Sequence, residues 1–516
     1  MKYNLKKEKY PLRKKIIADS IWNLGATMIA RLGGLIFTII AARLLMPEGY
    51  GQYSLALSIA IIFMTFADLG INQALMTYVS LEIDKNKKKA AAYFHYLFKI
   101  KVILATIVSM VILLSSYPLA NFIFKKPELF PLLVILSFYA FFLIISGFFE
   151  SSLYIKNKVR YITIKEAIFQ FLRLITFILV VYFVSKIYYV VGAIFGLTIA
   201  AFFNLVVIFL FYRKTFYLEK PEDYEQYLDK KRILKFIGFL TIANLSSAFF
   251  SYIDIVMLGL FVSSENIGYY KAAIGLIFAI AGTLSFSGIF LSVMTKIKKK
   301  NIQGAFDKII NYLLVLLIPA IIGLIMLSKY IFVMIYGYAY LPAASLMILL
   351  APLLFFMAFV SLFLNLLSSR EKTKEFAFFT LFCTVLNIIL NYAFIKFFLQ
   401  YSQLAAIRGV AIATLISWII YFFGTLIISQ KQVNVHFNYK LLIKPILASI
   451  IMGIFLYTFN KITLDMTPLI GLFEVAIAVL VYFIVLILIG GVRKEDLRLI
   501  YDYLFPHKKF IRLFLN

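Results

Sequence analysis

Four polar residues recur at four-residue intervals in the first apolar segment of the chain: Asp19, Asn23, Thr27 and Arg31. In a helix this spacing places all four side chains on one face. The guanidinium of Arg31 falls near the middle of the segment, where placing a cation in a bilayer costs roughly 2.5–3.5 kcal/mol. A cation at that depth binds an anion, and the chemistry it offers is electrostatic recognition.

Two carboxylates in other apolar segments are candidate partners for that guanidinium. Asp68 lies towards the predicted cytoplasmic end of the second segment, and Asp254 lies within the seventh. Each is a candidate for a buried salt bridge with Arg31 or for the binding of a coupling cation, Na⁺ or H⁺. If neither pairs with Arg31, that residue is expected to face a cavity and an anionic substrate.

Arg173 and Lys271 are two further cations whose place in or near an apolar segment needs an explanation. Arg173 shares a helical face with Glu166 and Gln170, and Glu150 ends the preceding segment. A buried ion pair with Glu166 or Glu150 is preferred to a role in binding a ligand. Lys271 follows a Gly-Tyr-Tyr sequence at the outer end of the eighth segment. A lysine there either anchors the helix at the membrane interface or faces a cavity.

Uncharged polar residues accompany the charges on the first and seventh segments. In hydrocarbon such groups face other helices or a water-filled cavity. Contacts between helices are their more frequent role. The alternative hypothesis is that they line a cavity and bind substrate hydroxyl groups; the candidates are Asn23, Thr27, Asn244, Ser247 and Ser251.

The segments that must position these residues are long and apolar. The chain of 516 residues is 63% hydrophobic and has a mean hydropathy of +0.94. Stretches of roughly 20 apolar residues, enough to cross ~30 Å of hydrocarbon, recur throughout its length. We therefore predict an all-α polytopic membrane protein with about fourteen transmembrane helices. A transmembrane β-barrel would show short alternating segments instead.

The net charge of +28 lies mainly in the gaps between the apolar segments. There, lysine and arginine act as topology signals and contact anionic lipids, so no nucleic-acid partner is expected. Cation-rich and cation-poor gaps alternate along the chain, which predicts a multi-pass protein of the cell membrane with both termini in the cytoplasm. A single cysteine and three scattered histidines give neither a disulfide framework nor a metal site.

A modest internal repeat suggests two lobes. The stretches IWNLGATM and GQYSLALSI in the first half are echoed by IANLSSAF and GYYKAAIGL in the second. We predict an N-lobe of six spans in residues 1–211 and a charged cytoplasmic linker at 212–232. A C-lobe of six spans would follow at 233–428, with two more spans and a basic tail at 429–516. An even number of spans per lobe makes the lobes parallel.

Residues 41–80, AARLLMPEGYGQYSLALSIAIIFMTFADLGINQALMTYVS, resemble the N-terminal signature of the polysaccharide-biosynthesis flippases, the Wzx-type oligosaccharide exporters. Residues 265–273, ENIGYYKAA, resemble the family's start of span 8. Residues 385–418 resemble its paired asparagines and the Gly-x-Ala-x-Ala-Thr segment that follows. The second lobe departs at 408–411, where Arg-Gly-Val-Ala replaces the family's frequent Gly-x-x-Gly-Ala.

The resemblance implies a V-shaped bundle of the multidrug/oligosaccharidyl-lipid/polysaccharide superfamily, built around a central cavity. It implies a flippase, not an enzyme, that moves an isoprenoid-(di)phosphate-linked glycan from the inner to the outer leaflet by alternating access. Arg31, Lys271 and Arg173 would bind the phosphate. Membrane lipids and glycan polymerases or glycosyltransferases are the expected partners. Coupling to Na⁺, H⁺ or the membrane potential would take the place of a cofactor.

Three alternatives stay open. A peptidoglycan-precursor flippase would share the fold and the basic cavity. A cation-coupled small-molecule antiporter of the same superfamily is disfavoured, because cationic drugs prefer acidic sites. A membrane glycosyltransferase is disfavoured by short predicted outer loops that lack paired catalytic carboxylates or a metal site.

Overall fold

The computed structural model describes residues 4–216, 218–219, 224–284, 302–368, 370, 374–462 and 468–491. All of the elements in these ranges are helical, as the sequence predicts. Ten of the described helices are long and apolar enough to cross a membrane, or eleven if one bent pair counts as a single span. The protein is therefore a multi-pass α-helical membrane protein, and the expected number of about fourteen spans stays a prediction.

The α-helices are α1 (Asn4–Asp68), α2 (Ile71–Glu82), α3 (Lys87–Pro118), α4 (Leu129–Ile155), α5 (Val159–Phe183), α6 (Tyr189–Thr215), α7 (Lys230–Phe261), α8 (Ser264–Leu284), α10 (Ile302–Met326), α11 (Ser328–Ile335), α12 (Ala344–Leu350), α13 (Leu353–Ser368), α14 (Lys374–Leu399), α15 (Gln403–Val433), α16 (Ile443–Ile462) and α17 (Pro468–Leu488). Short π or 3₁₀ turns are η1 (Leu119–Ile123), η2 (Lys186–Tyr188), η3 (Tyr224–Tyr227), η5 (Tyr338–Ala343) and η6 (Tyr439–Leu442).

The helices pack into two compact units. One comprises residues 1–283 and 374–421, and the other comprises 284–373 and 422–516. This division follows the packing of neighbouring helices, and the boundaries of the predicted lobes stay a prediction. Every candidate site residue that the sequence singles out belongs to the first unit.

The long helix α1 contains two of the predicted spans, joined at a break. Met46 leaves the helical conformation, with φ 59° and ψ 171°. Pro47 follows it, and a proline ring disfavours the helical region for the residue before it. Proline also has no N–H to continue the ladder of hydrogen bonds. The break therefore separates two spans without an intervening loop.

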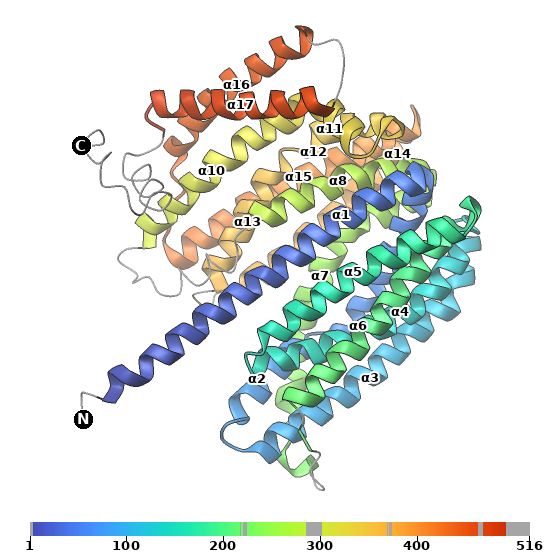
Figure 1. Ribbon diagram of the computed structural model, residues 1–516, viewed down its shortest axis with the longest axis vertical. Helices are drawn as coiled ribbons and strands as arrows, with labels where there is room; N and C mark the ends of the chain where they lie inside the picture. Colours follow the sequence, from blue (N-terminus) through green and yellow to red (C-terminus); the bar gives the residue numbers. More distant parts are fainter. Residues whose placement is uncertain are drawn as a thin grey trace. The chain divides into compact units, whose positions relative to one another are not determined.

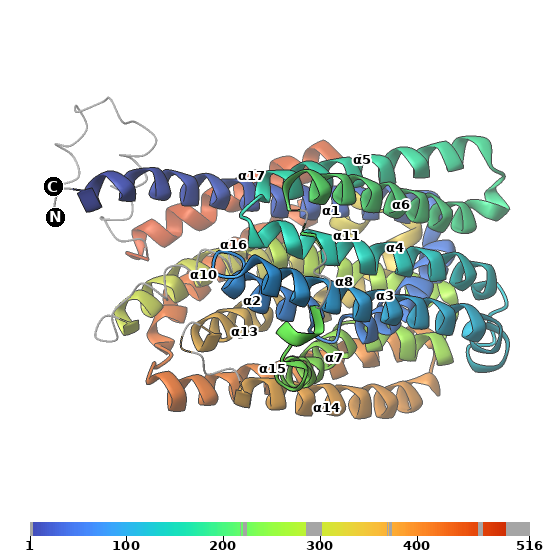
Figure 2. The ribbon, with the colours of Figure 1, turned by 90° about the horizontal axis from the view of Figure 1, so that it is seen from below.

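Helices α3 to α6 form a bundle in the first unit, drawn from blue to green in Figure 1. Figure 2 shows them side by side in the order α5, α6, α4, α3. Aromatic rings fill the bundle core: Phe94 stacks on Tyr212 with 5.3 Å between ring centroids and meets Phe148 edge-on at 5.2 Å. Much of the high aromatic content is thus structural.

In the second unit, α10, α16 and α17 pack together, and the hydroxyl of Tyr482 donates to the Val315 carbonyl at 2.8 Å. The segments Tyr338–Leu350 and Leu353–Ser368 are bent by 50° relative to each other. Pro352 lies at the bend, where proline interrupts helical hydrogen bonding.

Candidate functional site

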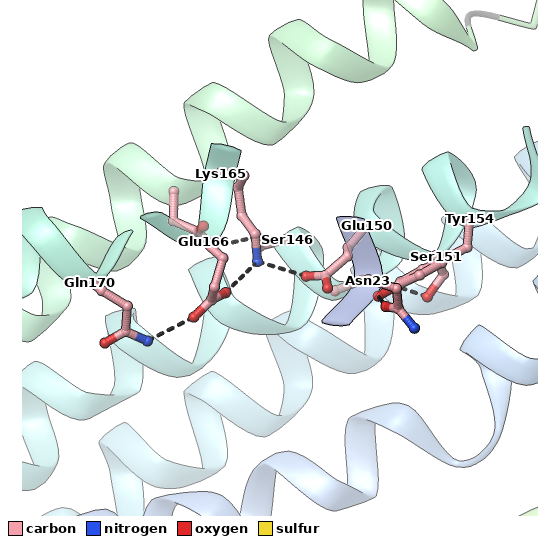
Figure 3. A network of polar contacts seen from close by, with 10 residues as sticks. Asn23, Ser146, Glu150, Ser151, Tyr154, Lys165, Glu166 and Gln170 are labelled. Carbon is pink, nitrogen blue, oxygen red and sulfur yellow. Dashed lines mark hydrogen bonds and ion pairs between the residues drawn. The ribbon is translucent and has the colours of Figure 1, made fainter. Parts of the chain in front are cut away.

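Two buried lysines of the first unit are paired with carboxylates. The ammonium of Lys101 lies 2.7 Å from Asp68. The ammonium of Lys165 lies 2.8 Å from Glu150 and 3.1 Å from Glu166. Figure 3 shows Lys165 between these two carboxylates. Such pairs compensate charges that the bilayer would otherwise make costly.

Three other cations of the spans differ from these lysines. In the part of the chain that the structure describes, no carboxylate lies within salt-bridge distance of Arg31, Arg173 or Lys271. We call these three residues the unpaired cations. They lie on α1, α5 and α8, and all three are only partly exposed.

Arg31 on α1 donates a hydrogen bond from Nη1 to the carbonyl of Gly282 on α8. A carbonyl carries no formal charge, so this contact does not compensate the positive charge of the guanidinium. The two carboxylates proposed as its partners have other contacts here: Asp68 pairs with Lys101, and Asp254 accepts bonds from neutral donors.

Arg173 on α5 crosses towards the middle of α1. Its Nη2 donates to the Gly33 carbonyl at 3.3 Å, and its Cζ lies 4.2 Å from the centre of the Phe37 ring. Among the residues that the structure describes, the buried Nε of Arg173 has no hydrogen-bond partner. Glu166, the carboxylate on the same face of α5, instead accepts hydrogen bonds from Lys165 and Gln170.

Lys271 on α8 lies near Tyr252 of α7, with 5.9 Å between its Nζ and the centre of the ring. Arg173 and Lys271 thus each lie beside an aromatic ring, Phe37 for the guanidinium and Tyr252 for the ammonium.

The uncharged candidates make mostly local contacts. Thr27 donates to the Asn23 carbonyl at 2.9 Å, and Ser251 donates to the Ser247 carbonyl at 2.8 Å. Such bonds within one helix are common for hydroxyl side chains in membranes. The buried Nδ2 of Asn244 has no hydrogen-bond partner within the described ranges. The side chain of Asp19 lies outside the described residues, and a substrate role for this set stays a prediction.

Asp254 on α7 forms the centre of a second polar site. One carboxylate oxygen accepts from the hydroxyls of Tyr270 at 2.7 Å and Thr414 at 2.8 Å, and the other accepts from the Asn391 amide at 2.6 Å. The same amide donates to Asn387 at 3.1 Å. Three neutral donors thus solvate a carboxylate that is only 4% exposed.

The sequence singles out Asp254 as a candidate site residue, whereas Tyr270, the paired asparagines and Thr414 stand out only within motifs that resemble the family. Asn387 and Asn391 lie four residues apart on α14, and Thr414 lies on α15. Their four-residue spacing was the available signal, but uncharged polar residues in apolar helices usually serve helix packing. Only the folded chain brings α7, α8, α14 and α15 together around one carboxylate.

Comparisons with known proteins support a common origin. Residues 16–289 match the family model described as polysaccharide biosynthesis protein. A probable low-salt glycan biosynthesis flippase of Haloferax volcanii, Agl15, is 23% identical over 283 residues. That alignment covers 54% of this chain and 57% of Agl15, so the chain matches little more than half the length of this relative.

Solved structures share the fold across most of both chains. A lipid II flippase, MurJ, in an inward closed conformation has a TM-score of 0.71 at 21% identity, covering 91% of this chain and 98% of its own. An inward-facing multidrug resistance MATE transporter of the MOP superfamily has a TM-score of 0.60 at 16% identity, covering 80% and 98%. A MOP superfamily transporter from Pyrococcus furiosus follows at 0.56, with 16% identity and coverage of 82% and 96%.

At these identities the structural likeness establishes the fold alone. The family model, by contrast, matches more than half of the chain's 516 residues. The chain therefore belongs to the polysaccharide biosynthesis protein family, and its helices adopt the fold of MOP superfamily transporters.

Proposed function

We propose that this protein flips an isoprenoid-(di)phosphate-linked oligosaccharide from the cytoplasmic to the outer leaflet by alternating access. The unpaired cations are the observation that carries the proposal. An uncompensated cation within a span is costly, and an anionic ligand removes part of that cost. A phosphate or diphosphate supplies the anion, and its oxygens match the planar donor fork of arginine.

The three unpaired cations have different roles in this proposal, according to where they lie. Arg31 reaches from α1 to Gly282 of α8, and Arg173 reaches from α5 to Gly33, two residues after Arg31 on α1. In this proposal Arg31 is the principal phosphate ligand, and Lys271 and Arg173 support it. Asn23 and Asn244 offer amide groups to glycan hydroxyls, while the lipid tail stays in the bilayer.

A cation coupled to transport would bind at Asp254. The carboxyl group is buried and surrounded by uncharged hydroxyl and amide side chains, which suits Na⁺ or H⁺ binding during the transport cycle. Asp68 is a weaker candidate, because Lys101 already compensates its charge. The membrane potential is the other driving force that this cycle could use, since a bound anion moves charge across the bilayer.

The names of the relatives agree with this transport function. Agl15 is described as a glycan biosynthesis flippase and MurJ as a lipid II flippase. We place the protein in the cell membrane with cytoplasmic termini, next to the glycosyltransferases or polymerase that make and use its cargo. A peptidoglycan precursor as cargo rests on the likeness to MurJ alone, so the glycan-biosynthesis family favours an oligosaccharide.

Glycan export by Arg31 variants tests the phosphate role. We expect Arg31→Ala and Arg31→Gln to lower export at least about tenfold at equal protein levels, since a charge-assisted bond is worth roughly 1.5–3 kcal/mol. Arg31→Lys keeps the charge but loses the fork, so it should retain partial export. Lys440→Gln, an exposed lysine of η6, is the control. Normal export by all three Arg31 variants would refute the phosphate role.

A further inference from the structure

Two glycines bring α1 and α8 into backbone contact. A methyl group added to Gly51 would overlap the carbonyl of Ser264 and lie 2.9 Å from the Gly268 nitrogen. A methyl group added to Gly268 would overlap the carbonyl of Pro47. Each obstacle is backbone, which cannot move aside as a flexible side chain would. Both positions therefore admit only glycine while this contact exists.

The contact joins the two halves of the sequence repeat. Gly51 and Gly268 each begin a Gly-x-Tyr sequence, in GQYSLALSI and GYYKAAIGL. Tyr53, two residues after the first glycine, packs against Phe37 with 6.2 Å between ring centroids, and Arg173 lies over that same ring. Tyr270, two residues after the second, donates to Asp254. The contact between α1 and α8 at these glycines therefore fixes where Tyr53 and Tyr270 lie along their helices, near Arg173 and at Asp254.

Lys126 contacts the C-terminal end of α7, close to the contact between Gly51 and Gly268; we call its contact with α7 the brace. From the connection between α3 and α4, its ammonium donates to the carbonyls of Gly259 and Val262, both at 2.9 Å. These carbonyls end α7, where a cation is favoured by the helix dipole and by unused acceptors. Ser264 and α8 begin two residues later, so the brace and the glycine crossing are neighbours.

We propose that Gly51 and Gly268 form a closure between α1 and α8 at the predicted outer side, and that this contact must separate before cargo can leave there. They are positioning residues for Tyr53 and Tyr270. The contact between small residues has no interlocked side chains, so it can part and re-form in each cycle. This inference takes the direction of transport from the proposed function, whereas the contact between Gly51 and Gly268 is independent of that function.

The closure is tested by shielding of a cysteine at the crossing. Ser264 is only 5% exposed, so Ser264→Cys in a Cys383→Ser background reports whether the crossing is closed. We expect Gly51→Ala and Gly268→Ala to speed its reaction with a membrane-impermeant maleimide at least about fivefold, as the closed population falls. Intact cells and inverted vesicles are labelled in parallel to fix the side.

Gly275→Ala is the matched control, because it lies on α8 and an added methyl group meets no described atom within 4 Å. Its labelling should equal that of the parent. The two closure variants should also keep their affinity for the lipid-linked cargo while maximal export falls, which a general folding defect would not produce. Labelling of both variants at the parent rate would refute the closure, as would rapid labelling of the parent itself.

If both glycine variants fail to fold, Lys126→Met tests the closure between α1 and α8 instead. It removes the brace on α7 without introducing a clash, so labelling of the Ser264→Cys thiol should rise, and Lys125→Met should leave it unchanged. Equal labelling of these two lysine variants would then overturn the proposal. Because the labelling needs no cargo, its failure is distinguishable from loss of export in the Arg31 variants, which tests the proposed function.

Discussion

Lys165 and Arg173 lie on the same helix, α5, but their surroundings assign them different roles. Lys165 is 5% exposed and contacts two carboxylates, whereas Arg173 has no carboxylate within salt-bridge distance in the described part of the chain. Removal of the lysine would leave Glu150 and Glu166 without their shared cation. Removal of the arginine would leave no such pair broken.

We therefore expect opposite effects from two methionine substitutions. Lys165→Met should lower the free energy of unfolding by about 3–5 kcal/mol, the usual cost of breaking a buried pair. Arg173→Met should change stability much less and reduce glycan export instead. Thermal unfolding in detergent and export at equal protein levels measure the two effects. Equal destabilisation by both substitutions would contradict the division into paired and unpaired cations.

Replacing one carboxylate oxygen of Asp254 by an amide nitrogen tests the polar site around this residue. In Asp254→Asn, one oxygen becomes an amide donor that faces a hydroxyl or amide donor. We expect a loss of about 1–3 kcal/mol in the free energy of unfolding. Any dependence of export on Na⁺ or pH should also disappear. Thr414→Ser, which keeps the hydroxyl, is the control; an unchanged ion dependence in Asp254→Asn would rule out this coupling site.

Charges are the part of the site that sequence could identify. Arg31, Arg173 and Asp254 stand out because an ionised group in an apolar run is costly and needs a reason. Asn391 and Thr414 carry no such cost, so their presence in the Asp254 site was not predictable from spacing. The sequence also does not show which cation pairs with Asp68, because only the packing of α3 against the end of α1 brings Lys101 to it.

At the scale of elements, hydrophobic length predicts the helices well, but their contacts depend on small residues. Gly33 of α1 lies against α5, and a methyl group there would come within 2.8 Å of the Gln170 side chain. The sequence shows the glycine but not its neighbour. The break at Met46 is likewise readable from Pro47, whereas the backbone contact of Gly51 with α8 is not, because it joins segments over two hundred residues apart.

Two alanine substitutions should therefore shift stability in opposite directions. Gly33→Ala overpacks the contact between α1 and α5 and should cost about 1–3 kcal/mol. The methyl group of Gly323→Ala in α10 meets no atom of the described residues within 4 Å, so it should stabilise the protein by up to about 1 kcal/mol through helix propensity. Thermal unfolding of both variants gives the comparison. A stabilised Gly33→Ala would show that α1 and α5 do not approach this closely.

At the scale of the whole molecule, the distribution of charge predicts an orientation. The lysines and arginines gather in alternate connections, and the membrane retains such connections in the cytoplasm. The connection between α3 and α4, which holds Lys125, is predicted outside. The connection between α4 and α5, which holds Lys158, is predicted inside. Both lysines are exposed, so each can be replaced by cysteine with little effect on packing.

Single cysteines at these two positions, in a Cys383→Ser background, test the orientation. A membrane-impermeant maleimide should label Lys125→Cys in intact cells, and Lys158→Cys only after the membrane is permeabilised. The result also decides on which side the Gly51–Gly268 contact lies, because Lys126 joins the Lys125 connection to the end of α7 beside it. The reverse pattern would place that contact in the cytoplasm, and the proposed closure would then guard the entry of cargo instead of its exit.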